Sequence, residues 1–333
     1  MEHRVRILWC VGCLAALVTL CTATIAGAAA PAWKPQDNVE IIVGAGAGGG
    51  NDNIARTLQK IMQDRRLIDA PSNVVNKPGG GGAIAFNYLG QHRANGHYLA
   101  ISSNTLLTNH ITGISRLSYH DFTPLAIMIN EYISFVVLPD SPLKTGRDLI
   151  AKLKSDPAAV TFGISSTLGN INHIAAAVVA RAAGIDVKKL KVVVFNSSAA
   201  SITAVLGGHV DVVAGPPSIS AKHIEAGKLR AVGIASPRRL GGSLATQPTW
   251  REQGLDAVVI NWRGVVGAQG IAAPQTAFWD ATFGRLARTD EWNRELERNL
   301  WDNAYTDSKD TVQYLKSQYD ELKRVLTELG FVK

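Results

Sequence analysis

The sequence predicts an α/β protein in which strands and helices alternate along the chain and most strands run parallel. Short apolar segments alternate with longer segments that have the helical period. Several of the apolar segments pass through turns of Gly, Ser and Asn directly into a helix. With 333 residues, of which 46% are hydrophobic, the chain can bury large cores and is long enough for two domains.

The expected strands are apolar runs bounded by Gly, Pro, Asn or Asp. They cover 39–43, 73–76, 98–102, 124–129, 133–138, 160–164, 191–195, 210–214, 230–235 and 258–267. The expected helices cover 53–66, 82–92, 145–154, 171–183, 199–207, 219–226, 275–288, 290–300 and 308–329. The first helix places Ile54, Leu58, Ile61 and Met62 on one face. One apolar stripe on the last helix indicates that this helix packs on a domain. Its members are Val312, Leu315, Tyr319, Leu322, Leu326 and Leu329.

The first thirty residues have the pattern of a secretory signal peptide. Arg4 and Arg6 precede an uncharged stretch that ends at Ile25, and small residues follow at 26–30. We expect cleavage after Ala28 or Ala29, so that residues 1–28 form the signal peptide and the mature protein is exported.

Two other interpretations of this segment are weaker. The apolar run approaches the roughly 18 residues of an uncleaved membrane anchor, but its small-residue end favours cleavage. A lipidated Cys21 is disfavoured by the bulky Leu20 before it. All three cysteines, Cys10, Cys13 and Cys21, lie in this segment, so we expect no disulfide and no thiol chemistry in the mature chain.

The charge pattern gives no indication of a nucleic-acid surface. The formal net charge is +7, and the basic residues cluster only at Arg65-Arg66, at 188–191 and at Arg238-Arg239. None of these clusters is interleaved with aromatic residues, as a nucleic-acid interface would be. Mild steering of anionic ligands and a plain solvated surface are both compatible with this pattern.

The most informative segment is a glycine-rich turn at 44–53, between the strand 39–43 and the first helix. Such a turn exposes backbone N–H groups at a helix N-terminus, where the helix dipole also favours negative charge. We therefore interpret this segment as an anion receptor made of backbone. Asp52 either caps the helix or contacts the ligand, and the cap is slightly favoured.

Two later turns repeat this arrangement. The strand 160–164 leads through 165–170 into a helix, and the strand 191–195 leads through 196–198 into another. Each turn alone could be an ordinary helix cap, but three such turns could surround one anion. His173 is expected more as a structural residue than as a ligand contact. Arg263 either pairs with a ligand carboxylate or forms an internal ion pair.

The sequence offers no constellation for catalysis. Gly44-x-Gly46-x-x-Gly49 matches a dinucleotide fingerprint, but no acidic residue ends the second strand, and no Gly-Lys-Ser/Thr follows for a Walker loop. There is no G-x-S-x-G and no H-E-x-x-H. We expect no enzyme activity, no cofactor and no metal. An exported α/β hydrolase or transferase acting on a small carboxylate is the alternative.

These motifs together resemble the periplasmic substrate-binding proteins of tripartite tricarboxylate transporters, the Bug family. The family's Gly-Gly-x-x-Asp and Ala-Arg correspond to 48–52 and Ala55-Arg56, and its Asn-x-Pro-Gly-x-Gly-Gly turn corresponds to 76–82. Further matches lie at 95–99, 163–173, 207–211, 226–231 and 262–264. The chain departs from the family pattern at Gly46, Ala47, Gly215 and 196–198.

The resemblance implies a type II periplasmic-binding-protein fold with two α/β lobes, a ligand cleft and hinge crossovers near 130–134 and 258–264. Lobe 1 would hold 35–131 and 262–333, and lobe 2 would hold 132–261. It implies a periplasmic, monomeric protein that hands a small organic anion to the membrane subunits of such a transporter. A secreted sensor that presents its liganded state to a receptor is a second binding hypothesis.

The predicted ligand-binding residues combine the three turns with two further side chains. Thr105 is expected to supply a donor from the first lobe, and Arg263 could supply a guanidinium. The full set is Ala45, Ala47, Gly48, Gly49, Asn51, Asp52, Thr105, Ser165, Ser166, Gly169, Asn170, His173, Asn196, Ser197, Ser198 and Arg263.

Overall fold

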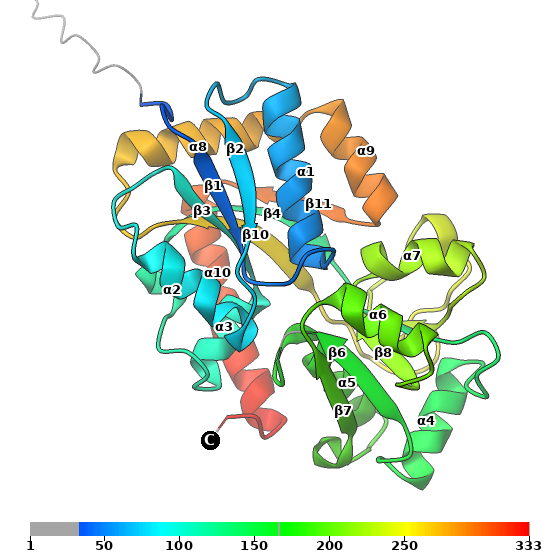
Figure 1. Cartoon of the computed structure of the whole chain (residues 1–333). Coiled ribbons are helices and arrows are strands. Elements are labelled where there is room, and N and C mark those ends of the chain that lie inside the picture. Colours follow the sequence, from blue (N-terminus) through cyan, green and yellow to red (C-terminus); the bar gives the residue numbers. More distant parts are fainter. Residues whose placement is uncertain (1–32, 166, 333) are drawn as a thin grey trace, which may run out of the picture. The chain divides into compact units, whose positions relative to one another are not determined.

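The computed structural model describes residues 33–165 and 167–332 (Figure 1). The predicted signal peptide, its cleavage position, the three cysteines and Ser166 lie outside the described residues. Within the described range, no helix combines the length and the apolar character that a membrane crossing would require.

The first sheet has six strands in the order β11-β4-β10-β3-β1-β2. Its strands are β1 (Val39–Val43), β2 (Ser72–Asn76), β3 (Tyr98–Ser103), β4 (Thr123–Glu131), β10 (Asn261–Gly267) and β11 (Asp302–Thr306). β1 pairs in parallel with β2 and β3, whereas β10 runs antiparallel to both β3 and β4, and β11 antiparallel to β4.

The first sheet carries the N-terminal and C-terminal helices (Figure 1). These are α1 (Gly50–Asp64), α2 (Ala83–Gly90), α3 (Asn104–Ile111), α8 (Ala273–Leu286), α9 (Asp290–Asn299) and α10 (Ser308–Glu328). Two short 3-10 helices, η1 (Gly80–Gly82) and η2 (Tyr119–Asp121), belong to the same part of the chain.

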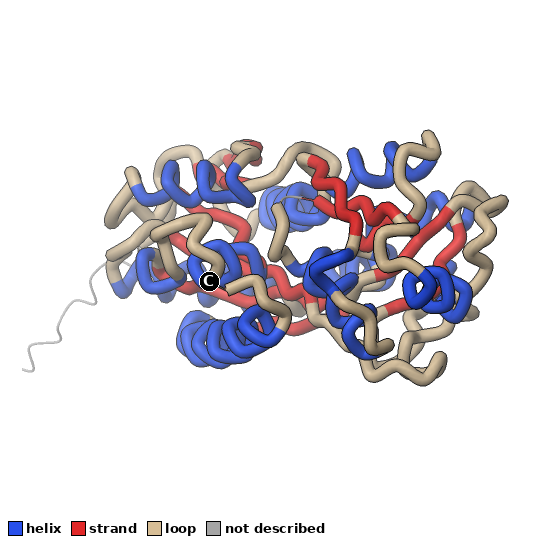
Figure 2. The backbone as a smooth tube through the Cα atoms, turned by 90° about the horizontal axis from the view of Figure 1, so that it is seen from below, coloured by secondary structure: helices blue, strands red, loops and turns tan. Residues whose placement is uncertain are grey.

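The second sheet has five strands in the order β7-β6-β8-β5-β9. Its strands are β5 (Ser134–Val137), β6 (Thr161–Ser165), β7 (Lys191–Phe195), β8 (Val212–Gly215) and β9 (Arg230–Ile234). Its helices are α4 (Gly146–Ser155), α5 (Ile171–Ala182), α6 (Ser198–Leu206), α7 (Pro217–Glu225), η3 (Val187–Lys189) and η4 (Gly242–Leu244). Figure 2 shows the strands of both sheets lying between helices, which is a layered α/β arrangement.

The chain passes from the first sheet to the second between β4 and β5, and it returns between β9 and β10. β4 ends at Glu131 and β5 begins at Ser134, so the first crossing is short. The two crossings lie close to the predicted ones.

The core follows the apolar patterns that predicted the elements. β1 buries nearly all of its side chains, and Ile54, Leu58, Ile61 and Met62 of α1 are all buried against the first sheet. On α10, Leu315, Leu322, Leu326 and Leu329 are buried, but Val312 is 41% exposed. The predicted stripe on α10 is therefore wrong at Val312, which lies near the helix start.

The structure contains every predicted strand and helix, and it adds two elements. α3 and β11 were not expected. α1 begins at Gly50 rather than at residue 53, because the last residues of the predicted turn already have helical backbone. β10 begins at Asn261 rather than at 258.

Candidate functional site

Five helices begin around one cavity of about 40 Å³, which we call the central cavity. α1 and α3 come from the first sheet, and α5, α6 and α7 come from the second. The residues that line it are Ala45, Gly49, Gly50, Asn51, Ser103, Thr105, Ser165, Asn170, Ile171, Asn172, Ser197, Ser198, Pro216, Asn261 and Arg263. The N-terminal N–H groups of these helices therefore surround one small space.

The glycine turn before α1 is fixed by Asp52. Its buried carboxylate accepts hydrogen bonds from the Gly48 N–H at 2.9 Å, the Asn76 amide at 2.9 Å and the Arg56 guanidinium at 2.9 Å. Gly48 has φ +75°, a conformation that favours glycine. Burial by itself raises the pKa of Asp52, but the hydrogen bonds from Arg56, Gly48 and Asn76 outweigh it and leave the pKa below 3.8.

The turn before α5 is fixed by Asn170 and His173. The Asn170 side-chain oxygen accepts from the His173 N–H at 3.0 Å, and His173 Nδ1 accepts from the Gly169 N–H at 2.9 Å. The imidazole stacks on Phe331 with the ring centroids 4.6 Å apart. Burial lowers the pKa of His173 to about 4, so this imidazole is neutral at pH 7.

Hydroxyl groups line the side of the central cavity that the second sheet provides. Ser197 caps α6 by accepting from the Ala200 N–H at 3.1 Å. The Ser165 and Ser198 hydroxyl oxygens lie 3.2 Å apart, and the Asn172 amide donates to the Ser165 hydroxyl at 2.7 Å. These short side chains leave room for a ligand while offering hydrogen bonds to it.

The turns of the two sheets approach each other closely at the central cavity. A Cβ placed on Gly46 or on Gly49 would lie 3.5 Å from the Ser197 Cβ. A Cβ on Gly81 would lie only 2.6 Å from the Thr167 methyl group. The glycines of the first sheet's turns thus allow contacts that side chains would prevent.

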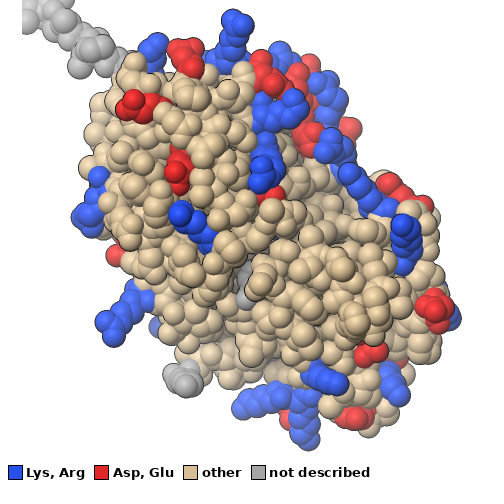
Figure 3. All heavy atoms as spheres, viewed as in Figure 1, with Lys and Arg blue, Asp and Glu red and all other residues tan. Residues whose placement is uncertain are grey.

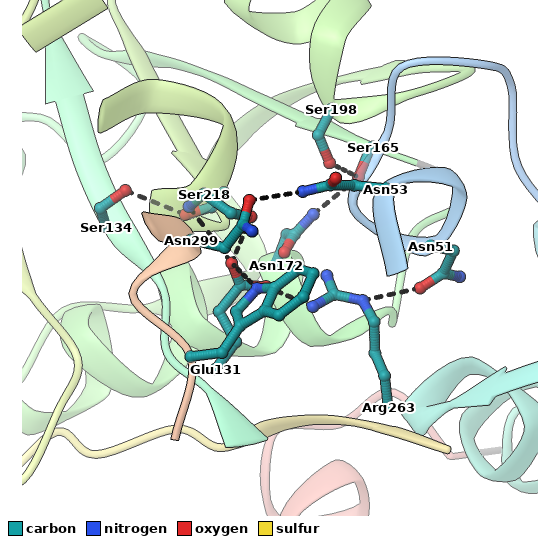
Figure 4. Close-up of polar contacts among 12 residues, drawn as sticks. Asn51, Asn53, Glu131, Ser134, Ser165, Asn172, Ser198, Ser218, Arg263 and Asn299 are labelled. Atoms are coloured by element: carbon teal, nitrogen blue, oxygen red, sulfur yellow. Dashed lines mark hydrogen bonds and ion pairs between the residues drawn. The ribbon is translucent and has the colours of Figure 1, made fainter. Parts of the chain in front are cut away.

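Arg263 is the only charged side chain that lines the central cavity among the described residues. It extends from β10, is 3% exposed, donates through Nε to the Asn51 side chain at 2.9 Å and forms an ion pair through Nη1 with Glu131 (Figure 4). A Cβ on Gly50 would collide with Arg263 Nη2. The missing side chain at Gly50 therefore makes room for the guanidinium beside the start of α1.

Glu131 lies behind Arg263 at the end of β4 and is fully buried. Its Oε1 accepts from the Ser218 N–H at 3.2 Å, from the Ser218 hydroxyl, and from the Trp301 indole N–H at 3.3 Å (Figure 4). Ser218 belongs to the first turn of α7. Glu131 thus joins the guanidinium of the first sheet to a helix N-terminus of the second.

The central cavity has the chemistry of an anion site. No Asp or Glu lines it among the described residues, while helix N-termini, hydroxyl groups and one guanidinium do. No group of three His, Cys, Asp or Glu side chains in the described range is placed to hold a metal ion. On the face drawn in Figure 3, charged side chains gather mainly toward the edges.

A sequence profile described as the tripartite tricarboxylate transporter family receptor matches residues 54–331. The chain belongs to this receptor family. It is 27% identical over 259 residues to the protein BugT of Bordetella pertussis, which covers 76% of this chain and 77% of BugT. The Bug resemblance predicted from the sequence is therefore confirmed, and the family is one of receptors rather than enzymes.

Solved structures confirm the predicted fold class. The periplasmic binding protein BugD has a TM-score of 0.82 at 19% identity and covers 90% of this receptor and 99% of BugD. MatC from Rhodopseudomonas palustris, solved with bound malate, has a TM-score of 0.79 at 20% identity and covers 88% of this receptor and 99% of MatC. The receptor thus has the fold of periplasmic solute-binding proteins.

Nine of the predicted ligand-binding residues line the central cavity of this receptor, and six others lie outside its lining. The lining nine are Ala45, Gly49, Asn51, Thr105, Ser165, Asn170, Ser197, Ser198 and Arg263. The six others are Ala47, Gly48, Asp52, Gly169, His173 and Asn196. Four of these six form the two hydrogen bonds that fix the turns, Gly48 with Asp52 and Gly169 with His173. The structural alternatives for Asp52 and His173 therefore describe their positions best.

The sequence prediction missed part of the lining: Gly50, Ser103, Ile171, Asn172, Pro216 and Asn261. A usable signal existed for Ser103 and Pro216, because both follow an apolar strand directly and precede a polar helix start. Pro217 at the first position of α7 is itself a helix-start signal. Glu131 was also missed, although a carboxylate that ends an otherwise apolar strand is unusual.

Proposed function

We propose that this receptor binds a small organic carboxylate in the central cavity and delivers it to the membrane subunits of a tripartite tricarboxylate-type transporter. The family membership supports the receptor role, and malate in the related MatC structure supports a carboxylate as the ligand class. The predicted signal peptide supports a periplasmic location for the mature chain. We infer that it acts as a monomer.

One observation carries this proposal: five helix N-termini meet at one cavity that no acidic side chain lines among the described residues. Each N-terminus contributes partial positive charge and unpaired N–H groups. A carboxylate can accept several such hydrogen bonds at once, and Arg263 adds a full positive charge. A neutral ligand would use only part of this arrangement.

The division into two lobes explains how binding is signalled. Lobe 1 would comprise 35–131 with 262–333, lobe 2 would comprise 132–261, and the two chain crossings would act as hinges. A ligand that touches turns from both lobes binds the closed form more tightly than the open one, so it shifts the population toward closure. The membrane subunits would recognise this closed form.

The lining residues supply the proposed contacts. Backbone N–H groups would come from Gly49 and Asn51 in lobe 1 and from 170–172 in lobe 2, with hydroxyl donors from Thr105 and Ser198. Ser166, which follows the lining residue Ser165, remains a candidate contact. Asp52 and His173 would act indirectly, by holding the turns in place.

A thermal-shift and calorimetry panel tests this function. Purified receptor is titrated with C2 to C6 mono-, di- and tricarboxylates, and a true ligand at about 100 times its Kd should add about 2.7 kcal/mol of stability. Asn51→Phe should abolish this gain, because the bulky ring would fill the central cavity. Lys60→Phe, at an exposed site on the same helix, should not.

Two results would contradict the proposal. One is a panel in which no small carboxylate stabilises the receptor. The other is a ligand whose binding is equally strong in Asn51→Phe and in the unmutated receptor, which would place the site elsewhere. Recovery of chemically unchanged ligand from the complex is expected of a receptor and separates it from an enzyme.

A further inference from the structure

Glu131 occupies the position that a ligand carboxylate would take at the N-terminus of α7. One of its oxygens accepts from the backbone N–H and the hydroxyl of Ser218 and from the indole of Trp301, and the other pairs with Arg263. A helix N-terminus, a hydroxyl and a guanidinium are the same kinds of donor that line the central cavity. The protein has therefore placed a carboxylate of its own in this set of donors.

This arrangement consumes two of the cleft's attractive groups. The Ser218 N–H at the start of α7 donates to Glu131, and Arg263 Nη1 is paired with the same carboxylate. The Arg263 and Glu131 side chains are 4% and 0% exposed, so bulk water screens the pair little. The only full positive charge that lines the central cavity among the described residues is thus neutralised from behind.

We propose that Glu131 is a specificity-determining residue, an internal carboxylate that makes the site favour acids with one negative charge. The expected ligands are monocarboxylic acids whose other polar groups are uncharged, such as hydroxyl or amide groups. This inference rests on the proposed function, because it concerns the same cavity.

The physical reason is the charge that a second ligand carboxylate would meet. It would lie within several ångströms of the buried Glu131 carboxylate, and at this range like charges in a protein interior repel appreciably. It would also find Arg263 already paired. A neutral group at the same place would meet neither penalty, so the energetic difference between one and two charges depends on Glu131.

A matched pair of ligands isolates this effect. The probes are malonate, succinate, glutarate and adipate, each compared by calorimetry with its half-amide, in which one carboxylate is replaced by an uncharged amide of similar shape. We expect the unmutated receptor to bind the half-amide at least as tightly as the diacid.

Three variants test the role of the charge. Glu131→Gln should raise the affinity for the diacid relative to its half-amide by on the order of tenfold. Arg263→Gln should lower the same ratio by a similar factor. The double variant Glu131→Gln/Arg263→Gln restores the net charge, so its ratio should return to within about threefold of the unmutated value.

A control removes a charge elsewhere on α7. Glu225→Gln, at the exposed C-terminal end of the helix, should leave the ratio unchanged. A merely structural role of Glu131 would weaken both ligands equally in all three variants and would leave the ratio constant.

The outcomes separate the two proposals. If diacids or half-amides bind but the ratio does not follow the net charge, or if the unmutated receptor prefers the diacid tenfold, the specificity inference is wrong and the carboxylate function stands. If no pair binds to the unmutated receptor, both proposals are overturned together. Should Glu131→Gln fail to fold, the ratios of Arg263→Gln and of the double variant still decide.

Discussion

The turns before α1 and before α5 present a helix N-terminus to the same cavity, one from each sheet, but they are held by different chemistry. In both, a glycine with positive φ donates its N–H to a side chain four residues later, Gly48 to Asp52 and Gly169 to His173, each at 2.9 Å. The acceptor is a charged carboxylate in the first turn and a neutral imidazole in the second.

The surroundings explain this difference. Asp52 is supported by Arg56 and Asn76, so its charge is compensated close by. His173 packs on Phe331 and has only backbone and apolar neighbours of this kind, where a charge would be costly. The two turns show that one backbone geometry can be fixed by either type of group, provided that the group has its own compensation.

The largest expected effect concerns the buried charge behind the first turn. Arg263→Gln leaves Glu131 buried without its cation, so the free energy of unfolding should fall by about 3–5 kcal/mol in denaturant titrations. Arg181→Gln removes an exposed ion pair with Glu328 on α5 and should cost less than about 1 kcal/mol. Equal losses in the two variants would mean that the first turn does not depend on the buried pair.

The second turn should show itself in the pH dependence of stability. His173 has a folded-state pKa of about 4, below its ordinary 6.5, so the unfolded chain binds its proton first as the pH falls. Stability from this group is complete above pH 6.5 and declines by about 3 kcal/mol as the pH falls to 4. Denaturant titrations between pH 7.5 and 4.5 measure it.

The matched variant is His173→Asn, whose amide oxygen can accept from Gly169 but does not titrate. It should lose most of this pH dependence, whereas the exposed His120→Asn should keep it. A His173→Asn protein with the unmutated pH profile would show that another group is responsible.

The carboxylate of the first turn should have a smaller effect. Asp52→Asn removes charge-assisted hydrogen bonds to Gly48 and Arg56, so we expect a loss of about 1–3 kcal/mol at pH 7 by denaturant titration. Because the folded-state pKa is lowered, the contribution of Asp52 is present above pH 3.8 and is lost as the pH falls through that lowered pKa. The exposed Asp64→Asn, on the same helix, should stay within about 0.5 kcal/mol.

The smallest expected change affects binding rather than stability. Gly50→Ala would push the Arg263 guanidinium away from the start of α1, so we expect about a tenfold loss of ligand affinity, or about 1.4 kcal/mol, by calorimetry. Gly90→Ala places the same methyl group in open space at the end of α2 and should leave affinity unchanged. An unchanged affinity in Gly50→Ala would remove Arg263 from the ligand site.

The sequence predicts the strands, the glycine turn and the cavity-lining turns of both sheets well, because these depend on local patterns. α3 escapes prediction because its sequence is polar at Asn104, Thr105, Thr108 and Asn109, and it is stabilised by packing beside β3 and α10. β11 escapes because Asp302–Thr306 has no apolar alternation and is fixed only by its pairing with β4.

The roles of individual site residues are harder to predict than the turns that contain them. Asp52 and His173 have side chains suited to a ligand, and only the folded geometry shows that both point to backbone N–H groups behind the cavity wall. Glu131 and Arg263 are 132 residues apart in the sequence, so no local pattern could pair them. The structure adds this pair and the contribution of α7 to the site.

The place of β10 in the first sheet has a consequence for how the chain reaches this state. β10 lies between β3 and β4 and is the strand that joins them, yet it begins only at Asn261. A nascent chain that lacks this segment has two separate groups of strands with unpaired edges. The first sheet can therefore be completed only late in synthesis, which leaves the polypeptide unfinished, and open to chaperones or a translocation channel, until its last quarter is available.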